Sequence, residues 1–246
     1  MSLDSPNASS TYQYIDSNFQ VAYGGGDGAT GDWGSDIVSL GGAVLQNAQF
    51  GVMYKSTVEE GILGVSYTAI EGRQAFSGEP EYPNFPVLLV QQGYIASRAL
   101  SLYTNADNDA AVQGELLFGG IDTDKFTPPL VTIDLIASGF DGLPGVVDFT
   151  ISLNGASATD HLGSVSTFTS PPMNVILDSG TTFTNLAPAL VDQIWASVGA
   201  TAYTSTPEYA YVQCSGMYLF VSLRFSFVLG YQFESGQQET SSSWAA

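Results

Sequence analysis

Alternating apolar and polar residues in the first third of the chain predict strands joined by glycine-rich turns. Phe19 to Tyr23 alternates as a strand does, and Asp32 to Leu40 resumes the pattern after the glycine run at residues 24–31. We therefore expect a hairpin with a glycine-rich tip. Residues 1–18 are mostly polar turn-formers, and we expect an exposed loop there.

Two stretches have the pattern of short helices. Pro86 to Gly93 places proline where a helix can begin and glycine where it can end. Behind Pro188, apolar residues recur at helical spacing up to a glycine stop at Gly199; they are Leu190, Val191, Ile194, Trp195 and Val198. Both helices are expected to be brief interruptions of a strand-rich chain.

Further strands are expected in the middle and at the end of the chain. Segments 99–103 and 114–122 read as paired strands around a turn at 105–109, and Leu223 to Phe227 reads as another strand. Val146 to Leu153 reads as a strand that ends at an Asn154-Gly155 turn. Pro128-Pro129 breaks the strand pattern, so we expect a domain boundary at residues 125–129.

Composition supports an all-β fold. The chain has 246 residues, with 27 Gly, 13 Tyr and 14 Phe. Many aromatic and β-branched residues between glycine turns favour strands. This length can bury a large core as one β domain or as two smaller lobes, and length alone does not choose between them.

The charge balance excludes some partners. Asp and Glu number 24 against 5 Lys and Arg, a formal charge of -19 at pH 7. Such a chain repels phosphate backbones and anionic membranes, so nucleic-acid binding is not expected. Once the carboxylates are protonated in acid, few charged groups remain to repel one another, which favours an acid-tolerant protein. Solubility alone also explains the negative charge at neutral pH.

Metals, cofactors and membrane spans are not expected either. Cys214 and His161 are the single residues of their kinds, and no cluster has metal-ligand spacing. No Lys-Ser/Thr helix follows the glycine run, which argues against a phosphate-binding loop. The apolar run at 217–229 is too short to span a bilayer and contains Arg224, and no export signal begins the chain.

The strongest candidate for chemistry is Asp178. Three branched aliphatic residues precede it, and Ser-Gly-Thr-Thr follows, so a buried strand delivers one carboxylate into a tight loop. Gly180 allows backbone N–H groups to approach the carboxylate, and Thr181 and Thr182 offer hydroxyls. A structural aspartate that caps a turn is the alternative reading of the Asp-Ser-Gly tripeptide.

The segment from Ile176 to Thr182, followed by an amphipathic helix, resembles the second active-site loop of pepsin-like aspartic proteases. The hairpin resembles their flap, with Tyr23 at the position of the flap tyrosine. Downstream, Gly61-Ile62-Leu63-Gly64 matches a further segment of this family. In the order of these segments and in their residues, the chain looks most like the fungal secreted, candidapepsin-type enzymes, over roughly residues 10–214.

This resemblance implies an all-β fold with short helices, an incomplete bilobal pepsin-like double β-barrel. Residues 1–128 would be a partial N-terminal lobe with the flap hairpin but without the first catalytic loop. Residues 129–246 would be a partial C-terminal lobe with the second catalytic loop and a divergent tail. The tail at 234–246 is polar, and we expect it to be disordered.

The resemblance also implies the activity of an acid endopeptidase that acts on polypeptides outside the cell or at its surface, without a cofactor. Two aspartates share a proton and activate a water molecule. Asp178 would be one of them. The substrate would be contacted by Tyr23, Gly24, Gly25, Gly180, Thr181 and Thr182.

A second Asp-Thr/Ser-Gly loop is missing from these 246 residues. Asp4-Ser5-Pro6 and Asp16-Ser17-Asn18 lack the glycine that the turn requires. In the family a cysteine matching Cys214 pairs with a downstream partner, which is also missing. We therefore expect a chain truncated at both ends and inactive alone.

Two alternatives to a working enzyme stay open: a non-catalytic, peptide-binding pseudo-protease and a truncated gene product. A homodimer that pairs two Asp178 loops is disfavoured. Each copy would bring half a flap-bearing lobe that clashes with the dimer symmetry.

Overall fold

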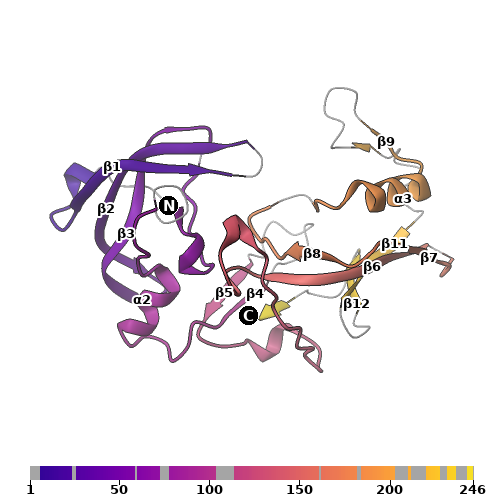
Figure 1. Cartoon of the computed structure of the whole chain (residues 1–246). Helices are drawn as coiled ribbons and strands as arrows, with labels where there is room; N and C mark the ends of the chain where they lie inside the picture. The colour runs from indigo at the N-terminus through magenta and orange to yellow at the C-terminus, as the bar shows by residue number, and fades with distance from the viewer. Residues whose placement is uncertain are drawn as a thin grey trace. The chain divides into compact units, whose positions relative to one another are not determined.

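The computed structural model describes most of the chain, in two compact units. It describes residues 6–23, 26–58, 60–72, 78–103, 114–160, 162–181, 184–202, 210–211, 220–227, 232–236 and 243–245. Unit 1 comprises residues 1–105, 109–126 and 242–246, and unit 2 comprises residues 106–108 and 127–241. Figure 1 shows the elements of both units.

Unit 1 is built on an antiparallel meander of three long strands. These are β1 (Gln13–Ala22), β2 (Gly28–Leu40) and β3 (Ala43–Ser56), in the order β1-β2-β3. The predicted hairpin is confirmed, but β1 begins at Gln13, which pairs with Ser35 of β2. The loop expected at residues 1–18 is therefore wrong from Gln13 onward, because cross-strand pairing overrides the polar composition of this segment.

The hairpin loop is shorter than the glycine run suggested. The N–H of Tyr23 donates to the carbonyl of Asp27 at 2.8 Å, and Ala22 already pairs with Gly28. Residues 28–31, which we expected in the turn, belong to β2. Glycine composition alone cannot show where a turn ends, because strand pairing with β1 and β3 also accepts glycine.

One helix and a second small sheet complete unit 1. The helix α2 (Phe85–Gln91) confirms the prediction at Pro86, and it packs Phe85, Leu88 and Leu89 against Leu45 of β3 in a buried cluster. β4 (Leu100–Tyr103) pairs with β5 (Glu115–Phe118) as expected. The turn predicted at 105–109 lies outside the described residues. Short 3-10 helices are η1 (Pro6–Ala8), η2 (Thr68–Ile70) and η3 (Thr123–Lys125).

Unit 2 is organised around one long strand. β6 (Thr150–Asp160) pairs with β7 (Val165–Phe168), β8 (Met173–Ile176) and β11 (Phe220–Phe227), and β11 pairs in turn with β12 (Gln232–Gly236). The strand expected at the end of the chain is thus present. Unit 2 also contains η4 (Phe140–Gly142) and the short pair β9 (Thr201–Ala202) and β10 (Ala210–Tyr211).

Two expectations about unit 2 and the tail are wrong. The predicted Asn154-Gly155 turn does not form, since β6 runs straight through these residues with a register shift against β11. The turn lies instead after Asp160, whose carboxylate accepts hydrogen bonds from the N–H groups of Leu162 and Ser164. Of the tail predicted to be disordered, residues 234–236 belong to β12 and Ser243–Ala245 forms β13, which pairs with β4 in unit 1. The rest of the tail lies outside the described residues.

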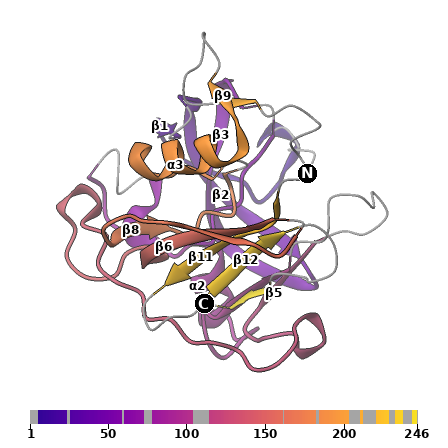
Figure 2. The ribbon, with the colours of Figure 1, turned by 90° about the vertical axis from the view of Figure 1, so that its right-hand side faces the viewer.

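The second predicted helix covers one face of the long sheet of unit 2. α3 (Pro188–Val198) begins at the predicted proline and ends before Gly199. Leu190 is fully buried in a cluster with residues of β6 and β7. Figures 1 and 2 both show α3 on the same side of the sheet that contains β6. This packing anchors the segment between β8 and α3.

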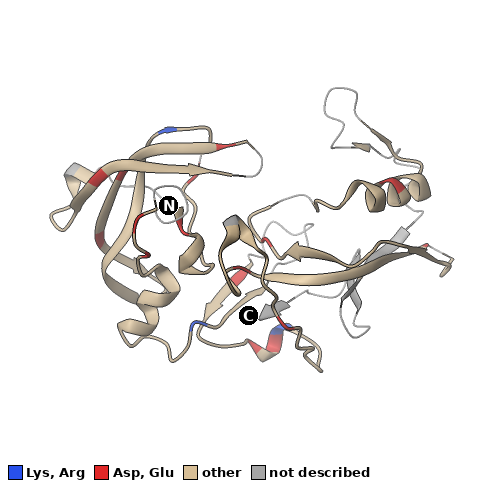
Figure 3. Ribbon diagram, viewed as in Figure 1, with Lys and Arg blue, Asp and Glu red and all other residues tan. Residues whose placement is uncertain are grey.

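Strands make up most of the regular secondary structure of the described residues, with α2 and α3 as α-helices, so the all-β prediction is confirmed. Figure 3 marks Asp and Glu in red and Lys and Arg in blue along the ribbon, and red positions occur in both units. Within these ranges, neither helix has the length or apolarity that crossing a bilayer requires. The assignment of residues 1–128 and 129–246 as partial lobes stays a prediction.

Candidate active site

Asp178 lies just beyond the end of a strand that is held in the sheet on one side. β8 pairs with β6 through Ile176 and Thr150, and the N–H of Leu177 donates to the carbonyl of Phe149 at 3.1 Å. Leu177 packs against the buried cluster of unit 2. Asp178 is the next residue, and it is exposed. The expected strand that ends at one carboxylate is present, but it is not buried as predicted: Val175 and Leu177 face the cluster, whereas Ile176 is 52% exposed.

Both oxygens of the Asp178 carboxylate accept hydrogen bonds from the loop that follows. The N–H of Gly180 donates to Oδ1 at 2.8 Å, and the hydroxyl of Thr181 donates to Oδ2 at 2.5 Å. These donors fix the direction of the carboxylate while its remaining lone pairs face outward. A carboxylate held in this way can bind a water molecule and exchange a proton with it.

The backbone of Gly180 lies close to the carboxylate of Asp178. A Cβ atom at this position would lie 3.2 Å from Oδ1 of Asp178, which is tighter than ordinary van der Waals contact. With a side chain at this position, the Asp178 carboxylate would have to shift by a few tenths of an ångström.

The helix behind the loop is fixed to the sheet by side-chain hydrogen bonds. Gln193 of α3 donates to the carbonyl of Thr169 at 2.8 Å and accepts from the N–H of Thr169 at 3.0 Å. Together with buried Leu190, these bonds hold the helix against the end of β7. The Asp178 loop is thus held at both ends, by β8 before it and by α3 after it.

Tyr23 lies at the tip end of β1, where the hairpin turns. Its carbonyl accepts from the N–H of Gly26 at 3.0 Å, and burial raises the pKa of its hydroxyl. Of the residues predicted to contact substrate, Gly24, Gly25 and Thr182 lie outside the described residues.

The structure brings Asp178, Gly180 and Thr181 together within unit 2. Tyr23 belongs to unit 1, where its surroundings are those of the hairpin. The roles predicted for these residues stay predictions.

A buried carboxylate that was not predicted from the sequence lies just before β6. Asp148, two residues before β6, is 2% exposed, and its Oδ1 accepts from the N–H of Thr150 at 3.1 Å. Its Oδ2 has no hydrogen-bond partner in the described part of the chain. Only its position before a predicted strand could have pointed to it, and buried carboxylates have no signature in a single sequence.

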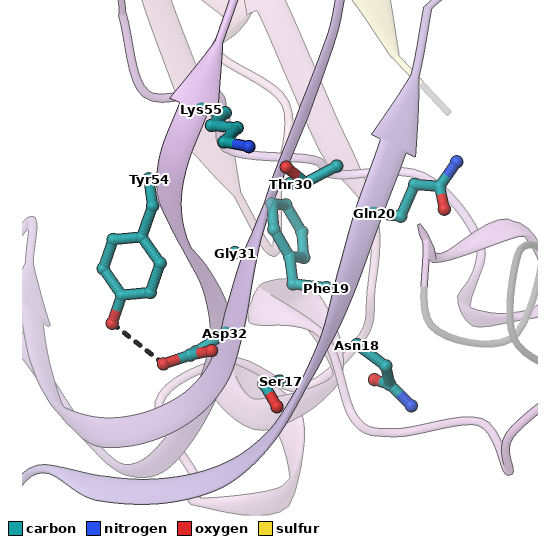
Figure 4. Close-up of a pocket in the computed structure, with 9 residues that line it drawn as sticks. All are labelled: Ser17, Asn18, Phe19, Gln20, Thr30, Gly31, Asp32, Tyr54 and Lys55. Atoms are coloured by element: carbon teal, nitrogen blue, oxygen red, sulfur yellow. Dashed lines mark hydrogen bonds between the residues drawn. The ribbon is translucent and has the colours of Figure 1, made fainter.

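A polar hollow of about 610 Å³ lies on the three-stranded sheet of unit 1. Figure 4 shows Tyr54 directed at Asp32, and its hydroxyl donates to the carboxylate at 2.9 Å. This hydrogen bond raises the pKa of Tyr54. The lining residues are Ser17, Asn18, Phe19, Gln20, Thr30, Gly31, Asp32, Tyr54 and Lys55. The hollow contains none of the predicted site residues.

Among the described residues, no group of three His, Cys, Asp or Glu side chains could hold a metal ion. His161 and Cys214 lie outside the described residues.

Comparison with known proteins places the chain in one family. The sequence profile described as "Eukaryotic aspartyl protease" matches residues 2–240. The "Probable aspartic-type endopeptidase OPSB" of Arthroderma benhamiae is 37% identical over 210 residues, which cover 85% of this chain and 41% of that protein. "Aspartic proteinase 3" of Saccharomyces cerevisiae is 33% identical over 220 residues, covering 85% of this chain and 38% of that protein.

A solved structure shows the same fold. The aspartic proteinase from Irpex lacteus superposes with a TM-score of 0.76 at 24% identity, covering 92% of this chain and 64% of that chain. The predicted fold class, a partial pepsin-like β fold, is confirmed by this match. The chain spans about two fifths of the length of the curated relatives it matches.

Proposed function

Because this chain belongs to the eukaryotic aspartyl protease family, we propose that Asp178 is one of the two catalytic carboxylates of an aspartic-type endopeptidase. The observation that carries this proposal is the exposed carboxylate at the end of an anchored strand, held by Gly180 and Thr181. A structural turn cap needs no exposure, whereas a catalytic acid must reach its substrate.

In the proposed mechanism Asp178 and a second aspartate share one proton and hold a water molecule between them. The ionised member takes a proton from the water as it attacks the peptide carbonyl, and the protonated member donates to the carbonyl oxygen. The N–H of Gly180 and the hydroxyl of Thr181 keep Asp178 oriented during this exchange. The hairpin with Tyr23, Gly24 and Gly25 would close over the substrate, and Thr182 would line the cleft.

The second aspartate has no candidate loop within these 246 residues. The polypeptide of these residues alone is therefore proposed to lack endopeptidase activity, because a single carboxylate cannot play both parts of the dyad. We propose polypeptides as substrates and an extracellular or cell-surface location, as the family resemblance implies.

The test supplies the missing loop. The segment that precedes the matched region in the Arthroderma benhamiae relative is fused in front of Gln13, and the chimaera is incubated with denatured protein at pH 3 to 5. We expect the chimaera to cleave and pepstatin to stop the cleavage. The 246-residue chain should release no peptides under the same conditions.

A chimaera that binds pepstatin but does not cleave would overturn the proposal. It would support the competing function, a pseudo-protease that binds peptides, which the lack of a second Asp-Thr/Ser-Gly loop favours. Calorimetric measurement of pepstatin binding distinguishes this outcome from a failure to fold, since an unfolded chimaera binds no pepstatin.

Removing the Thr181 hydroxyl should weaken catalysis without abolishing it. In Thr181→Val the Oδ2 atom of Asp178 loses its side-chain donor, and we expect kcat of the chimaera to fall by about tenfold, as for the loss of one hydrogen bond to a charged group. Thr181→Ser keeps the hydroxyl and should retain most of kcat. Equal losses in both variants would show that the methyl group, and not the hydrogen bond, matters.

A further inference from the structure

Glu71 is a half-buried carboxylate in unit 1, just after η2, whose side chain is fully engaged. Its Oε1 accepts from Nδ2 of Asn84 at 2.8 Å, and its Oε2 accepts from the hydroxyl of Tyr82 at 3.1 Å. The carboxylate lies against Gly64, where an added Cβ atom would be 3.9 Å from Oε1. It therefore fills the space between the loop at residues 61–70 and the segment that leads into α2.

Asn84 extends this contact to the helix and back to the loop. It is 5% exposed, and its Nδ2 also donates to the carbonyl of Ser66 at 2.8 Å. Its Oδ1 accepts from the N–H of Val87 at 3.4 Å, which caps the start of α2. One amide thus ties the loop, the Glu71 carboxyl and the helix together.

Tyr82 extends the contact to the three-stranded sheet. Its ring meets the ring of Trp33 edge to face at 5.6 Å between centroids. Trp33 is 2% exposed and meets Phe19 of β1 at 4.9 Å. The chain of contacts therefore runs from Glu71 to the strands that form the hairpin.

We propose that Glu71, Tyr82 and Asn84 form an acid-stabilised clamp, which holds the loop at residues 61–70 to α2 and to Trp33 in acid and loosens toward neutral pH. The clamp is a property of unit 1 and does not depend on the proposed activity.

Burial raises the pKa of Glu71, and the hydrogen bonds from Asn84 and Tyr82 oppose this shift in part. A carboxyl whose pKa is higher in the folded state binds its proton more tightly there than in the unfolded chain. Its contribution to stability is therefore fully present below the ordinary pKa of Glu. The contribution is lost as the pH rises through the folded-state pKa.

The protonated carboxyl fits the same contacts. Oε1 keeps accepting from Asn84, while a proton on Oε2 can be donated to the Tyr82 oxygen, whose own hydroxyl hydrogen turns away. No hydrogen bond of the clamp is lost on protonation. Ionisation instead places a charge in a half-buried site whose donors are both uncharged, which is unfavourable.

Other titratable groups lie on the elements around Glu71. Tyr67 lies in the loop and Glu60 just before it. The segment before α2 carries Glu79, Glu81 and Tyr82, β2 carries Asp32 and Asp36, and α2 carries none. Glu81 accepts from the hydroxyl of Thr68 at 2.6 Å at an exposed position. Arg73 lies outside the described residues.

The test compares Glu71→Gln with the unchanged chain across pH. Gln can accept from Asn84 and donate to Tyr82, so it imitates the protonated acid. Trp33 is made the single fluorophore by Trp195→Phe and Trp244→Phe, and its thermal unfolding is followed from pH 3.5 to 7. We expect equal melting temperatures at pH 3.5 and a variant that melts at least about 4 °C higher at pH 7.

Two controls separate the clamp from other charge effects. Glu81→Gln removes the same charge from an exposed neighbour, and it should leave the pH dependence unchanged. In an Arg73→Gln background, Glu71→Gln should still give the same gain at pH 7. An ion pair with Arg73 would favour the ionised carboxylate and so hide the gain; absence of the gain in both backgrounds would overturn the proposal.

A uniform fall in melting temperature at every pH would also overturn it, because Glu71 would then be a structural residue without a protonation role. If the tryptophan variants do not fold, hydrogen exchange on the chain with all its tryptophans gives the same information. Protection of residues 64–71 and 84–88, corrected for intrinsic rates, should fall toward pH 7 in the unchanged chain and stay constant in Glu71→Gln.

Discussion

Replacing Asp178 by Asn is expected to lower the cleavage rate of the chimaera by at least about 10²- to 10⁴-fold, the range for losing one acid–base partner. Asn can still accept from the N–H of Gly180, so the loop can keep its shape. It cannot take up or release the proton that the dyad must exchange with water. The measurement is kcat on a fluorogenic peptide between pH 3 and 5, with pepstatin binding as evidence of folding.

Asp160 is the matched control for this substitution. Its carboxylate also caps a turn, through the N–H groups of Leu162 and Ser164 at 2.8 Å each. Asp160→Asn should reduce stability slightly and leave kcat intact. If Asp178→Asn also retained kcat, or lost activity only in proportion to its unfolded fraction, Asp178 would be a structural turn cap and the dyad assignment would be wrong.

The features that sequence predicted well are the local ones. The Asp178 loop is a contiguous run in which strand, acid, glycine and hydroxyls follow one another, so its internal hydrogen bonds are implied by residue order. The limits of α3 follow in the same way from Pro188 and Gly199. Such signals need no knowledge of what lies elsewhere in the chain.

The expectations that failed depended on distant partners. The polar segment that begins at Gln13 is a strand because its backbone pairs with β2. Asn154-Gly155, a common hairpin turn, stays inside β6 because β11 pairs on both sides of it. The tail forms strands for the same reason, since β12 and β13 each find an open edge. Pairing of this kind is decided by tertiary structure, and local propensity does not reveal it.

Contacts between side chains that are distant in the sequence could not be predicted either. Glu71 meets residues 11 and 13 positions away across an irregular segment. Asp32 and Tyr54 meet across two strands, 22 positions apart. Neither pair has a fixed spacing that a motif could capture, and in a chain with 24 acidic residues a single Glu or Asp attracts no notice.

Replacing Gly31 by Ala is expected to destabilise unit 1 by about 1–3 kcal/mol, the usual cost of overpacking. Gly31 lies in β2, next to a register shift in its pairing with β3. A Cβ atom there would lie 1.9 Å from the carbonyl oxygen of Val52, which is backbone and cannot turn aside. The two strands would have to separate at the point where they support the hairpin and bring Tyr54 to Asp32.

Gly155→Ala is the matched control, because Gly155 is also a strand glycine and the nearest atom to an added Cβ is 3.6 Å away. We expect its effect to stay within about 0.5 kcal/mol. Urea unfolding followed by Trp33 fluorescence, in the background without Trp195 and Trp244, measures the first variant, and unfolding followed by Trp195 measures the second. Equal effects of the two substitutions would mean that β3 yields freely at Val52, so that close strand contact does not hold the hairpin in place.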